Sequence, residues 1–197
     1  DLTGLPEFTC SKPFHLGVSL NKTPNDISNL IPKNCHDFEQ IIFTANENLS
    51  LHGLDSVNTI NNLFCLNNKN CDFTALHNLR DVNHFEINNQ NVYDVQFGVL
   101  SKITSLNILE LADLENLRNI EQLLPNLEEV KDHVYLNNNI HLRDIGLLNA
   151  LEIPVSSKLL LPSHYKDRIN ITNNPNLHDC ASDYICRALQ VYPDSVA

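Results

Sequence analysis

Short segments of alternating apolar and polar residues recur along the chain. β-Branched, aromatic or other apolar side chains occupy every second position in them, which is the period of a half-buried β-strand. The predicted strands cover residues 41–44, 63–66, 85–87, 106–108, 134–136 and 169–171. We therefore predict six short strands that belong to one repeated unit.

A turn follows each strand and leads to an apolar residue, and five of the six turns are rich in asparagine. These apolar residues lie at positions 49, 71, 92, 114, 140 and 177, so the successive gaps are 22, 21, 22, 26 and 37. Further apolar residues then recur every two or three positions, as in Cys71, Phe73, Leu76 and Leu79. A period of roughly 20 to about 29 residues is typical of a solenoid, in which each repeat forms one coil. The pattern predicts about six stacked coils with a parallel β-sheet along one side.

The recurring asparagines have a structural role in such a stack. Of the 197 residues, 29 are asparagine and only 5 are glycine. A buried turn leaves backbone groups that need partners, and an asparagine amide can both donate and accept hydrogen bonds. We predict an inward-facing ladder of one asparagine per coil, formed by Asn48, Asn70, Asn91 and Asn176, with Asp113 in the equivalent position of the fourth coil. The alternative is that asparagine reflects a compositional bias.

Three segments depart from the repeat. Residues 113–125 carry apolar side chains at helical spacing before Pro125, and residues 179–190 fit an amphipathic C-terminal helix. The Leu159–Leu161 run predicts a further strand hidden in the longest gap. We expect an N-terminal cap over residues 1–38, a solenoid over 39–178 and a capping helix with a tail over 179–197, in one continuous α/β domain.

Charge narrows the classes of partner. The formal net charge is −11, which disfavours nucleic acid and anionic membrane surfaces as partners. No apolar run reaches the length of about 18 residues that predicts a membrane span. The chain begins at Asp1 and contains no methionine, so we expect a processed and secreted product.

The chain contains six cysteines, an even number that allows disulfide pairing. They could form three local disulfides, Cys10–Cys35, Cys65–Cys71 and Cys180–Cys186, two of which would close the ends of the solenoid. The alternative is six reduced and buried thiols in a cytosolic protein. The spacing of Cys and His residues fits no zinc motif.

Candidate chemistry is weak throughout. The sequence contains no nucleophile elbow, no metalloprotease motif and no phosphate-binding loop. His178, Asp179 and Cys180 are adjacent at a predicted helix start, where neighbouring side chains point apart. The acidic residues between Glu110 and Asp132 lack the alternation of a calcium loop and fit a solvated face. We therefore predict no enzyme activity, no cofactor and no metal site.

A ligand would meet the outward residues of the predicted strands. We assign to this column, one residue per strand, Thr44, Phe64, Glu86, Asn107, Tyr135 and Asn170. Exposed aromatic residues such as Phe64 and Tyr135 are favoured at binding surfaces. The alternative is that these two rings face inward, in a strand register shifted by one residue.

The last predicted coil resembles a known group of proteins. Residues 169–189, with Asn173-Asn174-Pro175-Asn176-Leu177 followed by Cys180 and Cys186, are similar to the closing repeat of secreted bacterial leucine-rich proteins. They also resemble the receptor L domain. The resemblance covers about residues 40–190 and implies a right-handed solenoid that recognises partners outside the cell. The glycines that often precede L-domain strands are mostly missing here.

Together these features predict a non-catalytic extracellular or cell-surface module. It would bind a protein or a glycan through the exposed face of its sheet. The alternative from another class is a structural domain of the cell surface or wall that has no specific ligand. An enzyme of the parallel β-helix type acting on acidic polysaccharide would need a cationic groove, and the 13 Lys and Arg residues are scattered.

Overall fold

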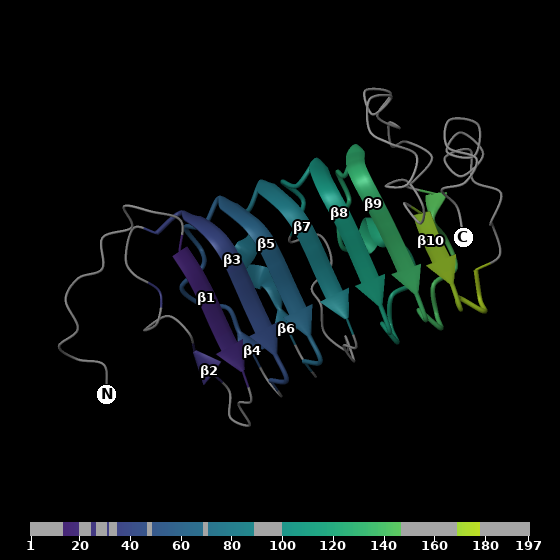
Figure 1. The fold of residues 1–197 in the computed structure, drawn as a ribbon, viewed down its shortest axis with the longest axis horizontal. Coiled ribbons are helices and arrows are strands. Elements are labelled where there is room, and N and C mark those ends of the chain that lie inside the picture. The colour runs from purple at the N-terminus through teal and green to yellow at the C-terminus, as the bar shows by residue number, and fades with distance from the viewer. Residues whose placement is uncertain are drawn as a thin grey trace, which may run out of the picture.

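The computed structural model describes residues 14–19, 25–26, 31, 35–46, 49–68, 71–88, 100–146 and 169–177. These residues form a long, flat β-solenoid of about four turns (Figure 1). The strands and 3₁₀ turns are β1 (Phe14–Ser19), β2 (Asn25–Asp26), β3 (Asp37–Thr44), β4 (Leu49–Ser50), β5 (Thr59–Leu66), β6 (Cys71–Asp72), η1 (Phe73–Leu76), β7 (Asp81–Asn88), β8 (Ser105–Ala112), η2 (Ile120–Gln122), β9 (Glu129–Asn137) and β10 (Ile169–Thr172).

Seven of these strands form one parallel sheet in the order β1-β3-β5-β7-β8-β9-β10 (Figure 1). The first residues of β3, β5 and β7 are Asp37, Thr59 and Asp81, which are evenly spaced and pair with one another across the sheet. Equivalent residues of successive coils therefore lie side by side. All six predicted strands lie within β3, β5, β7, β8, β9 and β10. The prediction of a solenoid with a parallel sheet is confirmed.

The core lies behind this sheet and is filled by every coil in the same way. In β5, Ile60, Leu63 and Cys65 point inward and are fully buried, and β3 and β7 repeat the pattern. The return path of each coil adds side chains such as Leu76 and Leu79, also fully buried. A second parallel sheet of the short strands β2, β4 and β6 lies on another side of the coil. Each coil therefore buries its apolar residues only against its neighbours, as a solenoid requires.

Left-handed backbone ends most of the long strands. Ala45, Asn67, Asp113, Asn138 and Asn173 have φ between 54° and 57°. Asparagine and aspartate tolerate this conformation better than other non-glycine residues because their short polar side chains bond locally. The turn therefore needs no glycine.

The residue after this turn points into the core and forms the asparagine ladder. Asn46, Asn68 and Asn139 are 0–1% exposed, and they are the buried polar residues of the described chain. Asn68 Oδ1 accepts hydrogen bonds from the backbone N–H and the Nδ2 of Asn46, at 2.9 and 2.8 Å. Asn139 Nδ2 donates to the Leu111 carbonyl at 2.9 Å, and Asn174 Oδ1 accepts from the Asn139 N–H at 2.9 Å.

The ladder therefore exists, but its members Asn46, Asn68 and Asn174 stand two residues before the predicted Asn48, Asn70 and Asn176. Asn176 is exposed, so its predicted place in the core is wrong, although its Nδ2 donates to the Ile140 carbonyl at 2.6 Å. Asp113 is exposed and is the left-handed turn residue, while the buried Leu114 takes the inward position of that coil. Asn48, Asn70 and Asn91 lie outside the described residues.

The α/β assignment is not supported, because the described ranges contain two 3₁₀ turns and no α-helix. The predicted helix over residues 113–125 is replaced by an irregular path that includes only η2, whose N-cap is Asn119. Leu114, Leu117 and Ile120 are all buried, so their spacing of three is that of successive inward turns of a coil. The predicted C-terminal helix, residues 179–190, lies outside the described residues.

The ends of the sheet bear on several other predictions. β1 lies within the segment assigned to the N-terminal cap, yet it pairs in parallel with β3 and starts the sheet. β10 pairs directly with β9, so no strand from the Leu159–Leu161 run lies between them. Cys65 is a buried thiol, so the predicted Cys65–Cys71 disulfide is wrong. Cys10, Cys180 and Cys186 lie outside the described residues, and the two pairings that involve them stay predictions.

Candidate functional face

The outer face of the solenoid is the side of the seven-stranded sheet that points away from the core. Paired residues on neighbouring strands form rows across it, and one of them, the central row, runs through all seven strands. The central row consists of Gly17, Ile42, Phe64, Glu86, Glu110, Tyr135 and Asn170.

Four of the six residues that we predicted as an outward column lie in this row. They are Phe64, Glu86, Tyr135 and Asn170, and each is half-buried. Thr44 lies two residues further along β3 and pairs with Leu66, so Ile42 takes its predicted place. Asn107 lies three residues before Glu110 on β8, where it lines a different part of the face.

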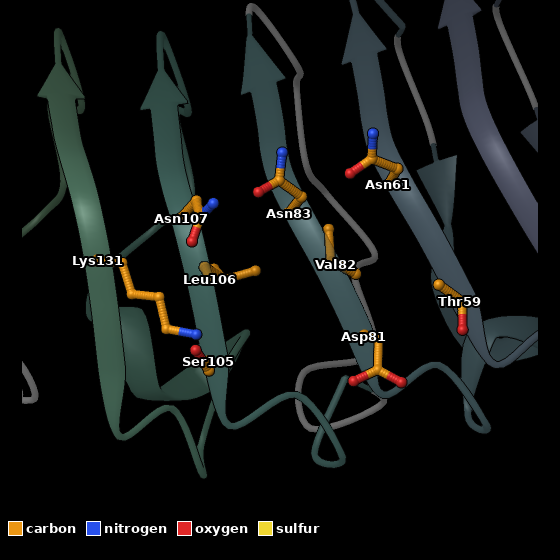
Figure 2. A pocket seen from close by; sticks show the side chains of 9 residues that line it. All are labelled: Thr59, Asn61, Asp81, Val82, Asn83, Ser105, Leu106, Asn107 and Lys131. Carbon is orange, nitrogen blue, oxygen red and sulfur yellow. The ribbon is translucent and has the colours of Figure 1, made fainter.

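That part of the face is a shallow polar hollow near the start of the strands (Figure 2). It is lined by Thr59, Asn61, Asp81, Val82, Asn83, Ser105, Leu106, Asn107 and Lys131. The amides of Asn61, Asn83 and Asn107 project from β5, β7 and β8, side by side (Figure 2). Asn61 Nδ2 donates to Glu39 Oε1 at 2.8 Å, whereas the amides of Asn83 and Asn107 have no hydrogen-bond partner within the described structure. Two side-chain amides are therefore open to a ligand.

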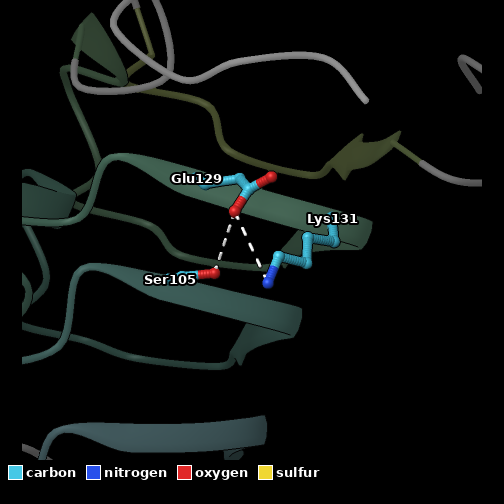
Figure 3. Close-up of polar contacts among 3 residues, drawn as sticks. All are labelled: Ser105, Glu129 and Lys131. Atoms are coloured by element: carbon cyan, nitrogen blue, oxygen red, sulfur yellow. Dashed lines mark hydrogen bonds and ion pairs between the residues drawn. The ribbon is translucent and has the colours of Figure 1, made fainter. Parts of the chain in front are cut away.

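An ion pair holds one wall of the hollow in place. Glu129 Oε2 accepts a hydrogen bond from Ser105 Oγ at 3.1 Å and lies 3.6 Å from Lys131 Nζ (Figure 3). Lys131 is half-exposed, so this contact contributes at most about 1 kcal/mol to stability. Its consequence for a ligand is local, because Glu129 neutralises the cation that lines the hollow.

A second group of polar side chains lies further along the strands, at the centre of the outer face. His84 and Glu86 project from β7 on the same side, and Glu110 of β8 pairs with Glu86. One ligand-type atom of each of the three side chains lies within 4.8 Å of the other two. His84 Nε2 is buried, has no hydrogen-bond partner and is 3.9 Å from Glu86 Oε2. An imidazole and two carboxylates therefore converge on one point without bonding one another.

Burial shifts the acid–base behaviour of all three groups. Burial raises the pKa of Glu110. Burial and then repulsion from Glu110 raise the pKa of Glu86, while a hydrogen bond with Asn88 partly lowers it. Burial, and then the nearby His133, lower the pKa of His84. Each shift disfavours the charged form. Burial therefore favours the neutral forms of His84, Glu86 and Glu110.

Glu110→Gln is expected to stabilise the metal-free protein at pH 7, by less than about 1 kcal/mol because the site is half open to water. The pKa of Glu110 is higher in the folded than in the unfolded chain, so the folded state binds this proton more tightly. The contribution of Glu110 to stability is therefore greatest below its ordinary pKa of 4.5. It is lost as the pH rises through the pKa that Glu110 has in the folded protein. A neutral amide removes that loss.

Urea unfolding between pH 4 and 7 in the presence of EDTA measures the effect. Glu121→Gln, at an exposed carboxylate in η2, is the matched control. An unchanged pH slope in the Glu110→Gln variant would contradict the expectation.

Aromatic rings border the three polar side chains on both sides. The Phe64 ring of β5 meets the His84 ring edge to face, with centroids 4.8 Å apart. On β9, His133 and Tyr135 stack at 5.6 Å with an interplanar angle of 6°. The central row therefore reads aromatic, acid, acid, aromatic across β5, β7, β8 and β9.

Sequence reasoning missed His84, Glu110 and the amides of Asn61 and Asn83 as parts of one face. The signal was present, since Asn61 and Asn83 are separated by one coil period, and Glu86 and Glu110 by slightly more than one. It was hidden because Glu110 was grouped with the acidic residues that follow it, and because His84 belongs to no recognised motif.

The wider context of the chain adds two observations. Within the described residues no helix is long and apolar enough to cross a membrane. A comparison with known protein families, with curated proteins and with solved structures finds no significant match to this chain.

Proposed function

We propose that the chain is a non-catalytic extracellular recognition module that binds its ligand on the outer face of the seven-stranded sheet. The observation that carries the proposal is the mixed chemistry of that face: open amides in the polar hollow, and aromatic rings in the central row. A face that only spaces coils would be expected to carry uniform Ser, Thr and Asn. The mixture therefore favours binding over a structural domain without a ligand.

A neutral glycan fits the hollow better than a protein surface does. Parallel strands lie about 4.8 Å apart, so the Asn83 and Asn107 amides offer repeated donors and acceptors at the scale of sugar hydroxyl groups. Phe64 and Tyr135 lie further along the strands, in the central row, and offer ring surfaces to pyranose rings. The net charge of −11 and the carboxylates of Asp81, Glu86 and Glu110 disfavour acidic glycans. A basic protein is the remaining alternative.

The resemblance to leucine-rich proteins and the receptor L domain forms a further part of this proposal. The parallel sheet, the asparagine turns and the apolar return path support it. In such proteins an extracellular location and disulfides at the ends of the stack would be usual, so we retain Cys10–Cys35 and Cys180–Cys186 as predicted pairings.

A glycan array with the purified chain tests the function, followed by titration of any glycan that binds. The double variant Asn83→Ala/Asn107→Ala is expected to weaken binding about tenfold, because two ligand hydrogen bonds are lost. Asn126→Ala, at an exposed asparagine in a turn, is the control and should bind as the wild type. If no glycan binds but a basic protein does, the alternative ligand is favoured. If neither a glycan nor a basic protein binds, the proposal is overturned.

A further inference from the structure

We propose that the outer face holds one divalent transition-metal ion, best matched by Zn²⁺, bound by His84 Nε2 and by the carboxylates of Glu86 and Glu110. This inference does not depend on the identity of the ligand proposed above. It departs from the sequence prediction of no metal site, because the three residues belong to no local motif.

The backbone positions the three side chains before any ion arrives. His84 and Glu86 are two residues apart on β7, so they project from the same side of the strand. Main-chain pairing brings Glu110 of β8 opposite Glu86 and Ile108 opposite His84. Both strands are internal to the sheet, with β5 on one side and β9 on the other. Ligands on paired internal strands are held more rigidly than ligands on loops.

The distances fit a first coordination shell. Zn²⁺ binds imidazole nitrogen and carboxylate oxygen at about 2.0–2.2 Å, so ligand atoms of a tetrahedral site lie about 3.4 Å apart. His84 Nε2 and Glu86 Oε2 are 3.9 Å apart, and the three groups lie within 4.8 Å of one another. Small rotations about the side-chain bonds therefore bring all three atoms onto one ion. The separation between His84 and Glu86 is also too long for a hydrogen bond, so no such bond must be broken first.

The buried nitrogen is the independent observation that points to a ligand. His84 Nε2 has almost no contact with solvent and no hydrogen-bond partner in the structure. A buried polar atom without a partner is costly and calls for an explanation such as an ion. The surroundings supply one, since Glu86 Oε2 lies 3.9 Å from this nitrogen and Glu110 belongs to the same cluster of ligand-type atoms.

Charge favours a cation at the same point. Glu86 and Glu110 repel each other when both are ionised, and within the described residues no Lys or Arg forms an ion pair with either. A divalent ion neutralises both.

The donor set selects the kind of ion. Ca²⁺ takes six to eight oxygen ligands and Mg²⁺ keeps a nearly complete oxygen octahedron, whereas imidazole with carboxylates suits Zn²⁺ and its neighbours. Three protein ligands leave a fourth position of a tetrahedral ion unfilled. The site lies on the outer face, so water or a ligand bound there can fill that position.

Calorimetric titration of the EDTA-treated full chain with Zn²⁺ tests the proposal, with Co²⁺ absorption as a spectroscopic readout of coordination. We expect about one equivalent of Zn²⁺ to bind and to raise the unfolding temperature, because the ion binds only the folded state. His84→Ala and Glu110→Gln are each expected to weaken binding at least about tenfold. His15→Ala is the matched control, since His15 lies in the same row as His84 at the far end of the sheet.

Circular dichroism of each variant shows whether it folds. Loss of zinc binding in both ligand variants but not in His15→Ala supports the site. Absence of zinc binding in the wild type overturns it, and so does binding that neither ligand variant weakens. Ca²⁺ binding as tight as that of Zn²⁺ and unaffected by His84→Ala would show a carboxylate site without the imidazole, which also overturns it.

Discussion

Replacing Asn68 with alanine is expected to lower the free energy of unfolding by about 2–4 kcal/mol. The Asn68 amide makes three buried hydrogen bonds: it accepts from the backbone N–H and the Nδ2 of Asn46, and it donates to the Phe43 carbonyl at 2.9 Å. Alanine leaves these partners without hydrogen bonds inside the core, and each such group costs about 1–3 kcal/mol. The loss is large because the partners, Phe43 and Asn46, lie on either side of the turn of the previous coil, which then loses its support.

Urea unfolding followed by circular dichroism measures this loss. Asn68→Asp keeps the acceptor but removes the donor to Phe43 and buries a charge, so at neutral pH it should destabilise the protein at least as much. Asn176→Ala is the matched control: Asn176 is exposed and makes one hydrogen bond to the preceding coil, so its loss should stay near or below about 1 kcal/mol. Equal losses at Asn68 and Asn176 would contradict the ladder as the structure places it.

The asparagines of the turns show why the sequence predicted a ladder but not which residues form it. Most turns offer more than one asparagine, as in Asn46 and Asn48, and both positions recur at the coil period. Periodicity therefore reveals that one asparagine per coil is special without telling which. The choice depends on the left-handed residue at Ala45 or Asn67, which breaks the alternation of the strand and sends the next side chain inward. The spacing of the residues does not predict where this left-handed residue lies.

The strands were predicted because their inward residues are strongly apolar. Ile41 and Phe43, or Phe85 and Ile87, alternate with half-buried residues in a pattern that is hard to mistake. The first residues of the strands were harder to predict. Long strands carry two consecutive residues that are not fully buried, such as Asn61 with Asn62 or Asn83 with His84. Simple alternation fails at that pair.

The row of the outer face was predicted only in part. The coil from β5 to β7 has the same length as the one before it, and Phe64 and Glu86 were placed correctly in one row. The coil from β7 to β8 is longer, so the prediction chose Asn107 where the structure pairs Glu110 with Glu86. The cluster of His84, Glu86 and Glu110 follows from this register. Pairing between strands, which no local pattern contains, therefore decides the chemistry of the face.

The segment from Asp113 to Pro125 was mistaken for a helix for a similar reason. Apolar residues three apart fit one face of a helix, and they also fit a coil that turns inward every third residue. Stacking on the neighbouring coil decides between the two. Here Asn119 bridges to Asp144 in the next coil, and backbone N–H groups of Arg143 and Asp144 donate to the Arg118 carbonyl. An isolated sequence window does not show those partners.

Replacing Phe85 with alanine is expected to have the largest effect, a loss of about 3–5 kcal/mol in the free energy of unfolding. Phe85 is fully buried in β7 and packs edge to face on Phe73 at 6.3 Å. The cavity lies in the middle of the stack, and coils of a solenoid are stabilised only by their neighbours, so the coils on both sides lose contacts.

Phe64→Ala is the matched control for Phe85→Ala, since it removes the same side chain from the adjacent strand. Phe64 is half-buried on the outer face, so its loss should cost far less than that of Phe85, on the order of 1 kcal/mol. Thermal or urea unfolding of the two variants compares the two faces of the sheet directly. A slip of one residue in β5 would turn Phe64 inward, and the Phe64→Ala loss would then match that of Phe85→Ala. Because Phe64 belongs to the central row, that result would remove one of the aromatic rings on which the proposed binding face depends.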